Sequence, residues 1–399
     1  MEACVKKLLP RLLSLAVIVS LSVSACIARP TTCNDPLGCV TVNNKESIKI
    51  AVLLTLSGPD SPYGVDALRG VEMAIADKKE LAGHPIELVQ VDDHCTAEGG
   101  EAGAQQIAAD PTIVGVIGAT CSSASVPAAK ILSAANMVMI SPSSTAPSLT
   151  LAGQHSTGFF RTIYNDRAQG KSVAEFVFKV LGLRTMSTLH DGTPYSMELQ
   201  AAACENFEKL GGTCLGRIQL GGDADVAHKV LWLSKLHTDA VYFPVYTEDG
   251  IAVLNAIKKQ GITSALISSE SLLSTDFLQQ TGDLSRGMYL SGPTPVAEST
   301  SFSEKYRAAY GEDPIATYHL QAYDAALMLF TAIEQASTPA STTDNTIFIQ
   351  RQALRDSILR VRGVLGLSGT LTCSELGDCA EPRITIFQVQ DNAFTPIYP

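Results

Sequence analysis

The chain has 399 residues, of which 17% are charged and 46% hydrophobic, and it carries a formal net charge of −11 at pH 7. This length is sufficient for two lobes with separate cores, and the composition differs from that of disordered chains. The acidic balance argues against nucleic acid or an anionic membrane surface as the partner, and there is no P-loop motif for nucleotide phosphates.

The first 25 residues are predicted to be a signal peptide. Basic residues, the last of them Arg11, precede an apolar run over residues 12–21 that is too short to span a membrane comfortably. The following Val-Ser-Ala-Cys26 resembles a bacterial lipobox, which implies cleavage before Cys26 and a lipid on its thiol. An ordinary signal peptide that contains a cysteine is the alternative. Residues 26–46 are then expected to be a lipidated tether of an exported, periplasmic or cell-surface protein.

Strands and helices alternate after this tether. Strands are expected over residues 48–54, 86–91, 113–117 and 137–140. Helices are expected from the loop after residue 56 to residue 77, over 98–109 and over 124–136. Short apolar strands that alternate with helices are typical of a parallel, doubly wound sheet.

The less regular residues 146–165 are interpreted as a first crossing to another lobe, where the alternation restarts. Helices are expected over residues 166–181, 195–210, 223–236 and 248–260, and strands over 185–190, 214–220, 240–245 and 265–268. Residues 287–291 are interpreted as a crossing back, helices follow near 299–310, 315–337 and 346–360, and 384–389 is the clearest later strand.

These patterns predict an α/β fold of two doubly wound parallel-sheet lobes with multiple crossovers. Lobe 1 would comprise residues 47–162 and 292–369, and lobe 2 residues 163–291 and 370–399. A cleft between two such lobes is a natural site for a small molecule.

Hydroxyl side chains follow two successive strands of lobe 1. Ser122 and Ser123 stand where a helix N-cap belongs, and Ser141-Pro-Ser-Ser-Thr leaves the next strand. The carboxyl ends of parallel strands meet at one sheet edge, and a helix N-terminus there favours negative charge. Ser122, Ser143 and Thr145 therefore predict a site for a small anion, most simply a carboxylate. The alternative is that the two serines only cap the helix.

The cysteines favour export. Cys4 would leave with the signal peptide, Cys26 would carry lipid, and eight of the ten cysteines remain. Sequence alone does not fix their connectivity, but pairing between sequence neighbours is the simplest proposal: Cys33 with Cys39, Cys95 with Cys121, Cys204 with Cys214 and Cys373 with Cys379. Disulfides are favoured over metal because an oxidising compartment is expected and no zinc-like spacing occurs, so we expect no metal and no cofactor.

Several motifs, each weak singly, occur together. They are Ile50-Ala-Val-Leu-Leu-Thr-Leu-Ser-Gly-Pro with Tyr63-Gly, Gly118-Ala-Thr-Cys-Ser-Ser, Ile140-Ser-Pro-Ser-Ser-Thr, Phe160-Arg-Thr, His190-Asp-Gly-Thr-Pro-Tyr, Tyr246-Thr-Glu-Asp-Gly and Ser269-Glu. With the lipobox, they make residues 47–398 similar to branched-chain amino acid-binding proteins. These are extracytoplasmic receptors of ABC importers with the type I periplasmic binding fold, in which two lobes close like a Venus flytrap.

The resemblance implies a role for each matching residue. Ser122 would bind the carboxylate of the ligand, while Thr145 and the backbone at Ser143 would hold its carboxylate and ammonium groups. Glu270, at the end of a second-lobe strand, would take the ammonium. Tyr195 would close over the ligand, although it could instead be an aromatic residue packed on the lobe surface. Family members often pair the cysteines that match Cys95 and Cys121.

The resemblance also assigns Tyr63, Thr120 and Tyr246 to the pocket for the ligand's side chain. Tyr63 could instead cover the hinge, and Arg161 is expected to be structural. At the position of Thr120, family members that favour aliphatic ligands tend to carry a larger apolar residue. The small, polar Thr120 therefore argues against a leucine-like specificity. The cysteine pairs other than Cys95 and Cys121 are not general features of the family.

The resemblance implies a monomeric lipoprotein that captures an amino acid, most simply a branched-chain or hydrophobic one, and delivers it to an ABC permease in the membrane. Catalysis is not expected, because His190-Asp191 lacks an accompanying GxSxG nucleophile elbow. Two alternatives stay open: a receptor for an amide, urea or short peptide, and a sensory lipoprotein that signals to a membrane kinase.

Overall fold

The computed structural model describes residues 32–221, 223–296 and 300–399. The predicted signal peptide and the predicted lipidation site at Cys26 lie outside the described residues. Within the described part of the chain, no helix is both long and apolar enough to cross a membrane.

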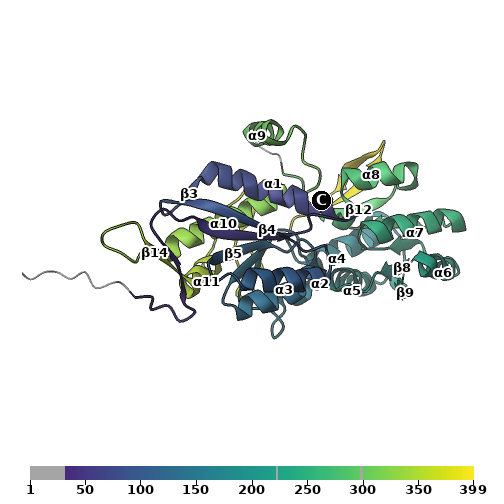
Figure 1. The fold of residues 1–399 in the computed structure, drawn as a ribbon. Helices are drawn as coiled ribbons and strands as arrows, with labels where there is room; N and C mark the ends of the chain where they lie inside the picture. Colours follow the sequence, from purple (N-terminus) through teal and green to yellow (C-terminus); the bar gives the residue numbers. More distant parts are fainter. Residues whose placement is uncertain (1–31, 222, 297–299) are drawn as a thin grey trace, which may run out of the picture.

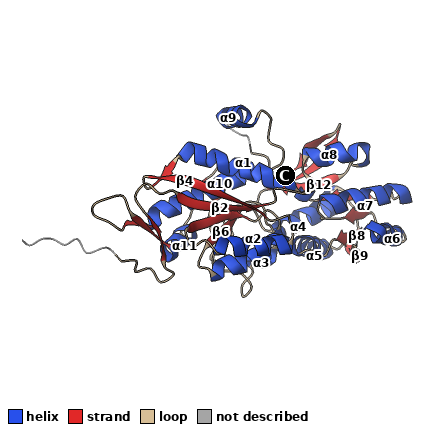
Figure 2. Cartoon of the chain, viewed as in Figure 1, coloured by secondary structure: helices blue, strands red, loops and turns tan. Residues whose placement is uncertain are grey.

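The first sheet has six strands in the order β3-β4-β2-β5-β6-β7. Their bounds are β2 Ile48–Leu54, β3 Glu80–Leu81, β4 His84–Asp92, β5 Ile113–Gly118, β6 Val138–Ser141 and β7 Phe159–Arg161. All neighbours pair in parallel except β3 with β4. Helices cover both faces (Figures 1 and 2), which explains why the central strands β2, β5 and β6 are mostly apolar and buried.

The two faces of the first sheet belong to separate cores. Ile50 and Val52 of β2 pack with α1 (Ser61–Lys78) and α10 (His319–Ala336). Ala51 and Leu53, which point the other way, pack with α2 (Ala97–Ala108) and α3 (Ser122–Ala134). The remaining helices of this half are α9 (Thr300–Tyr310), beside α1, and α11 (Arg351–Leu359), beside α10.

The second sheet has seven strands in the order β18-β17-β12-β11-β10-β8-β9. Their bounds are β8 Thr185–His190, β9 Thr213–Gln219, β10 Ala240–Tyr242, β11 Ala265–Ser268, β12 Tyr289–Pro293, β17 Ile384–Gln390 and β18 Ala393–Tyr398. Strands β8 to β12 are parallel, and β17 and β18 add an antiparallel edge. The predicted α/β fold of two doubly wound lobes is confirmed.

Helices also cover both faces of the second sheet. On one face lie α4 (Asp166–Glu175), continued by a π-helical turn over Phe176–Val180, and α5 (Pro194–Lys209). On the other face lie α6 (Asp223–Ser234), α7 (Thr247–Gln260) and α8 (Thr275–Thr281).

Short elements complete the fold. Strands β1 (Cys39–Val42), β13 (Ser337–Pro339) and β14 (Ile347–Gln350) form a small antiparallel sheet, and β15 (Val364–Leu365) pairs with β16 (Thr370–Leu371). The 3-10 turns are η1 Pro147–Thr150, η3 Glu270–Leu272 and η4 Gly282–Leu284.

Several segments differ from the sequence-based expectation. Ile347–Gln350 is the strand β14, although a helix was expected over residues 346–360. Val40 and Val42 of β1 are buried in the first core, so the end of the expected tether is part of the fold. Phe159–Arg161 and Tyr289–Pro293, which we interpreted as crossings, are the last strand of the first sheet and a central strand of the second. Both are apolar and short, and their pairing partners rather than their own length make them strands.

The lobe boundaries remain a prediction, but the sheets show where the chain changes lobes. It leaves the first sheet after β7, leaves the second after β12 and returns to the second at β17. Cys373 and Cys379 still pack in the core of the first lobe.

All four disulfides pair sequence neighbours as proposed: Cys33–Cys39, Cys95–Cys121, Cys204–Cys214 and Cys373–Cys379.

Candidate functional site

The turn after β5 is the first wall of the site. Gly118 has φ of +137°, and a Cβ there would come within 2.0 Å of the Leu53 carbonyl oxygen, so glycine is required. The backbone N–H of Thr120 donates to the Asp93 carboxylate (2.9 Å), and the Thr120 hydroxyl accepts from the backbone N–H of Thr55 (2.9 Å). These bonds hold the turn against the end of β2 and β4.

Helix α3 begins directly after this turn. Its N-cap residue is Cys121, so Ser122 and Ser123 are its first two residues and neither caps it. Instead, the Ser122 hydroxyl accepts from the backbone N–H of Ala146 (3.1 Å), and the Ser123 hydroxyl donates to the carbonyl of Cys95 (2.7 Å). The interpretation of these serines as caps is therefore wrong. The first N–H groups of the helix have no partner within it.

The turn after β6 packs against the first turn through its hydroxyls. Ser143 donates to the carbonyl of Thr120 (2.7 Å), and the hydroxyls of Ser144 and Ser125 bond to each other (2.7 Å). The side chain of the fully buried Arg161 donates to the carbonyl of Ser144 (3.1 Å). The serine-rich sequence thus cross-links two strand ends into one rigid surface.

Thr145 lies behind this surface rather than on it. It is fully buried and does not line the cavity described below. Its carbonyl accepts from the backbone N–H of Asp166, the first residue of α4 (3.0 Å). Burial and the nearby charge of Glu270 raise the pKa of Asp166 well above its usual value, while the Thr145 hydroxyl and Arg161 act in the opposite direction.

The second lobe contributes an aromatic wall. Tyr195, on the first turn of α5, stacks on Tyr246, the N-cap residue of α7, with ring centroids 5.3 Å apart. The Tyr195 hydroxyl donates to the hydroxyls of Ser269 (2.7 Å) and Ser271 (3.2 Å). Tyr195 is therefore a buried cavity residue and not an aromatic residue of the lobe surface.

Glu270 follows β11 and is the charged residue of the cavity wall. It is only 2% exposed, and no lysine, arginine or histidine among the described residues forms an ion pair with it. Burial raises its pKa from 4.5 to about 7, against the opposing effect of hydrogen bonds from Gln169 and Tyr195. Its carboxylate accepts a hydrogen bond from the side-chain amide of Gln169.

A cavity of about 30 Å³ lies between these walls. It is lined by Tyr63, Thr120, Cys121, Ser122, Ser143, Tyr195, Tyr246, Glu270, Ser271 and Tyr318. Of the eight predicted ligand-site residues, only Thr145 is not in this lining. Tyr318 and Ser271 were not predicted. Tyr318 comes from the segment before α10, far along the chain, where no local pattern marks it.

The lobes touch around the cavity. The Tyr63 hydroxyl donates to the Ser271 carbonyl (2.6 Å), and the backbone N–H of Thr247 donates to the Asp60 carboxylate (3.2 Å). The cavity presents hydroxyl and N–H donors on one wall and a carboxylate on the other, which suits a molecule with an anionic and a cationic group.

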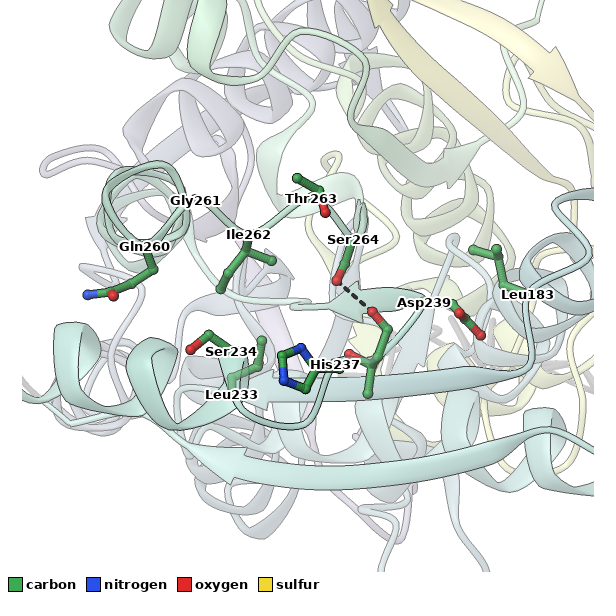
Figure 3. A pocket seen from close by; sticks show the side chains of 11 residues that line it. Leu183, Leu233, Ser234, His237, Asp239, Gln260, Gly261, Ile262, Thr263 and Ser264 are labelled. Carbon is green, nitrogen blue, oxygen red and sulfur yellow. Dashed lines mark hydrogen bonds between the residues drawn. The ribbon is translucent and has the colours of Figure 1, made fainter.

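A larger cavity, of about 570 Å³, lies elsewhere among the described residues. It is at the far end of lobe 2, beside the segments that precede β10 and β11 (Figure 3). Its polar groups are engaged with the protein: the Ser264 hydroxyl donates to the Thr238 carbonyl (2.6 Å), and the Asp239 carboxylate accepts from the N–H groups of Arg184 and Thr185. Its size alone does not indicate a ligand site.

The sequence model of a family described as periplasmic binding protein matches residues 47–392. The Leu/Ile/Val-binding protein of Escherichia coli is 26% identical over 353 residues, which cover 87% of this chain and 92% of that protein. A crystal structure of a leucine binding protein from Thermotoga maritima superposes with a TM-score of 0.78 at 24% identity, covering 88% of this chain and 97% of that one.

A solute-binding protein of an ABC transporter from R. palustris, solved in complex with benzoate, has a TM-score of 0.75 at 18% identity and covers 88% of this chain and 96% of that chain. Proteins with this fold thus include receptors for ligands of different chemistry.

Proposed function

The chain belongs to the periplasmic binding protein family, a family of solute-binding proteins and not of enzymes, and we propose that it captures a free amino acid between its two lobes. The observation that carries this proposal is the position of Glu270 across a closed cavity from Ser122 and Ser143. A zwitterion needs donors for its carboxylate and an anion for its ammonium group, and these opposed walls supply both.

The carboxylate of the ligand is proposed to bind the first lobe. The start of α3 supplies unpaired N–H groups and favours negative charge, and the Ser122 hydroxyl adds a donor. From the second turn, the backbone at Ser143 is proposed to hold the carboxylate and ammonium, whereas Thr145 does not line the cavity and supports the turn from behind. Charge-assisted hydrogen bonds of this kind contribute about 1.5–3 kcal/mol each.

The ammonium group is proposed to bind Glu270. A buried carboxylate without a cationic partner is costly, and a ligand ammonium would offset that cost. Because the two charged groups of the ligand contact opposite lobes, only the closed form makes all of these bonds. Binding therefore selects the closed form, and hinge closure of periplasmic binding proteins is a documented transition.

We propose branched-chain or hydrophobic amino acids as the first ligands to test, because the curated relatives are named for leucine, isoleucine and valine. The stacked rings of Tyr195 and Tyr246, with Tyr63, offer an aromatic wall to an aliphatic side chain. Thr120 is the one non-aromatic, polar residue assigned to the pocket for the ligand's side chain, and it is the residue that would allow a more polar ligand to bind.

The test is isothermal titration of the mature chain with L-leucine and then with the other free amino acids. Glu270→Ala should weaken binding at least tenfold, which corresponds to about 1.4 kcal/mol. Asp283→Ala, at a carboxylate that is 83% exposed, is the matched control and should bind normally. Unchanged affinity of Glu270→Ala would reject the ammonium assignment and favour an amide, urea or short peptide as ligand.

We further propose that the protein is a monomeric lipoprotein, anchored through Cys26, that delivers its ligand to an ABC permease. The lipobox-like sequence supports the anchor, and the relatives support transport rather than sensing. Cys26→Ser should move the protein from the membrane fraction to the soluble fraction of cells. Continued membrane association of this variant would reject the anchor.

A further inference from the structure

Gln169 makes an unusual contact for a buried glutamine. It lies on α4, is fully buried, and its side-chain N–H group donates to the Glu270 carboxylate. The same amide nitrogen lies 2.9 Å from the Ser291 hydroxyl and 3.3 Å from the Ser291 carbonyl on β12. One amide therefore joins the carboxylate of the cavity wall to the second sheet.

We propose that Gln169 is a positioning residue of the ligand site: its amide holds Glu270 as an ionised carboxylate, oriented to meet the ligand's ammonium group. The inference rests on the proposed function. Gln169 itself does not line the cavity, so it would act only through Glu270.

The geometry supports this role. An amide nitrogen carries two N–H donors, and Ser291 offers an anchor for the one that does not point at Glu270. Because Ser291 lies on a central strand of the second sheet, the amide is fixed and the carboxylate oxygen that it contacts is fixed with it. An amide N–H also stabilises the ionised carboxylate more than the neutral acid.

The groups around Glu270 make the hydrogen bond from Gln169 important for the ionisation of Glu270 near neutral pH. The titratable groups that interact with it are Asp166 on α4, Tyr195 on α5, Tyr242 on β10, Tyr164 after β7, Tyr63 on α1, Tyr246 before α7 and Tyr318 before α10, and Arg161 lies near Asp166. Arg161 is paired with Asp378 (2.5 Å). The Gln169 hydrogen bond is the largest influence opposing burial, which raises the pKa of Glu270 to about 7.

The experiment compares wild type, Gln169→Met and Gln200→Met by titration with L-leucine between pH 6 and pH 8.5. Gln200 is the matched control, because it is another buried glutamine of the second lobe that bonds to the Thr188 hydroxyl instead of a carboxylate. We expect affinity of the wild type to rise as Glu270 ionises. Gln169→Met should bind about tenfold more weakly at pH 7 and should recover most of that loss at pH 8.5, where the acid ionises without help.

A merely structural role would give a loss that does not change with pH, and that result would overturn the inference, as would unchanged binding. If Gln169→Met does not fold, Ser291→Ala tests the same arrangement more gently and should show a smaller loss with the same pH dependence. Failure of the wild type to bind leucine or any other amino acid would overturn the proposed function itself and this inference with it, whereas the outcomes above overturn the role of Gln169 alone.

Discussion

At the scale of single residues, Glu270 has two opposed effects. Its carboxylate is buried without a cationic partner among the described residues, which costs stability in the absence of a ligand. The same carboxylate would form a favourable ion pair with the ammonium group of a bound ligand. A site of this kind gains ligand affinity from a buried charge that lowers the stability of the ligand-free protein.

The pH dependence of stability follows from the pKa of Glu270, which is 4.5 ordinarily and about 7 in the folded protein. Between these values the unfolded chain releases its proton first, so the contribution of Glu270 to the free energy of unfolding falls as the pH rises. Glu270→Gln should therefore gain stability relative to the ligand-free wild type between pH 5 and pH 8, as measured by thermal unfolding.

The control for this measurement is Glu375→Gln, at an exposed residue of a loop. Its melting temperature should follow that of the wild type at every pH. If Glu270→Gln also ran parallel to the wild type from pH 5 to pH 8, Glu270 would not be ionising in the ligand-free protein in this range.

At the scale of elements, the two turns after β5 and β6 behave as one unit. The disulfide Cys95–Cys121 ties the first turn to the end of β4, and Cys121 is the residue before Ser122. The hydroxyl bonds of the second turn then depend on the first. The conformation of the donor wall is thus set by covalent and polar links rather than by apolar packing alone.

Removing this disulfide should affect both stability and binding. The bond closes a sequence separation of 26 residues, so Cys95→Ala/Cys121→Ala should lower the free energy of unfolding by about 3 kcal/mol in the chain-entropy description. Ligand affinity should fall too, because Ser122 loses its fixed position. Denaturant unfolding and titration with L-leucine measure the two effects.

The comparison variant is Cys33→Ala/Cys39→Ala, whose bond closes a separation of only 6 residues before β2. It should cost less stability and leave ligand affinity unchanged. Equal losses of affinity in the two double variants would show that the Cys95–Cys121 bond has no special effect on the site.

Most elements follow from local sequence, and the exceptions share a cause. The apolar run of β2 and the glycine that ends α7, Gly261, are strong local patterns, and the predicted bounds lie within a few residues of the observed ones. The strand β7 has only three residues and acquires its structure by pairing with β6. The predicted N-cap at Ser122 is one position too late, because the N-cap residue is Cys121. Cysteine is not among the residue types that are preferred as N-caps.

At the scale of the molecule, closure is held by contacts between lobes that surround the cavity. The Tyr63 hydroxyl donates to Ser271, and the backbone of Ser148 donates to the Glu198 carboxylate (2.7 Å). These bonds exist only when the lobes meet, so they stabilise the closed form without touching the fold of either lobe. Within the first lobe, Tyr63 is also held by a T-shaped ring contact with Tyr318, with ring centroids 5.9 Å apart.

Tyr63→Phe should therefore weaken ligand binding without destabilising the ligand-free protein. Loss of one neutral hydrogen bond costs about 0.5–1.5 kcal/mol, which corresponds to a roughly twofold to tenfold higher Kd. Faster dissociation of the ligand should account for most of the change. Tyr323→Phe, which loses a bond to Asp77 within lobe 1, is the control and should not alter Kd.

The sequence by itself determined the two-lobe α/β fold, because strand and turn patterns act over short stretches of chain. Most of the cavity residues followed from the resemblance to a known family, and the cysteine spacing suggested the disulfide partners without fixing them. Only the tertiary structure decided which side chains far apart in the sequence meet. It brought Tyr318 into the cavity, left Thr145 behind it, and joined Gln169 to Glu270. Such pairings depend on how α4 and α10 pack on the two sheets, and residues a hundred positions apart carry no local signal of that packing.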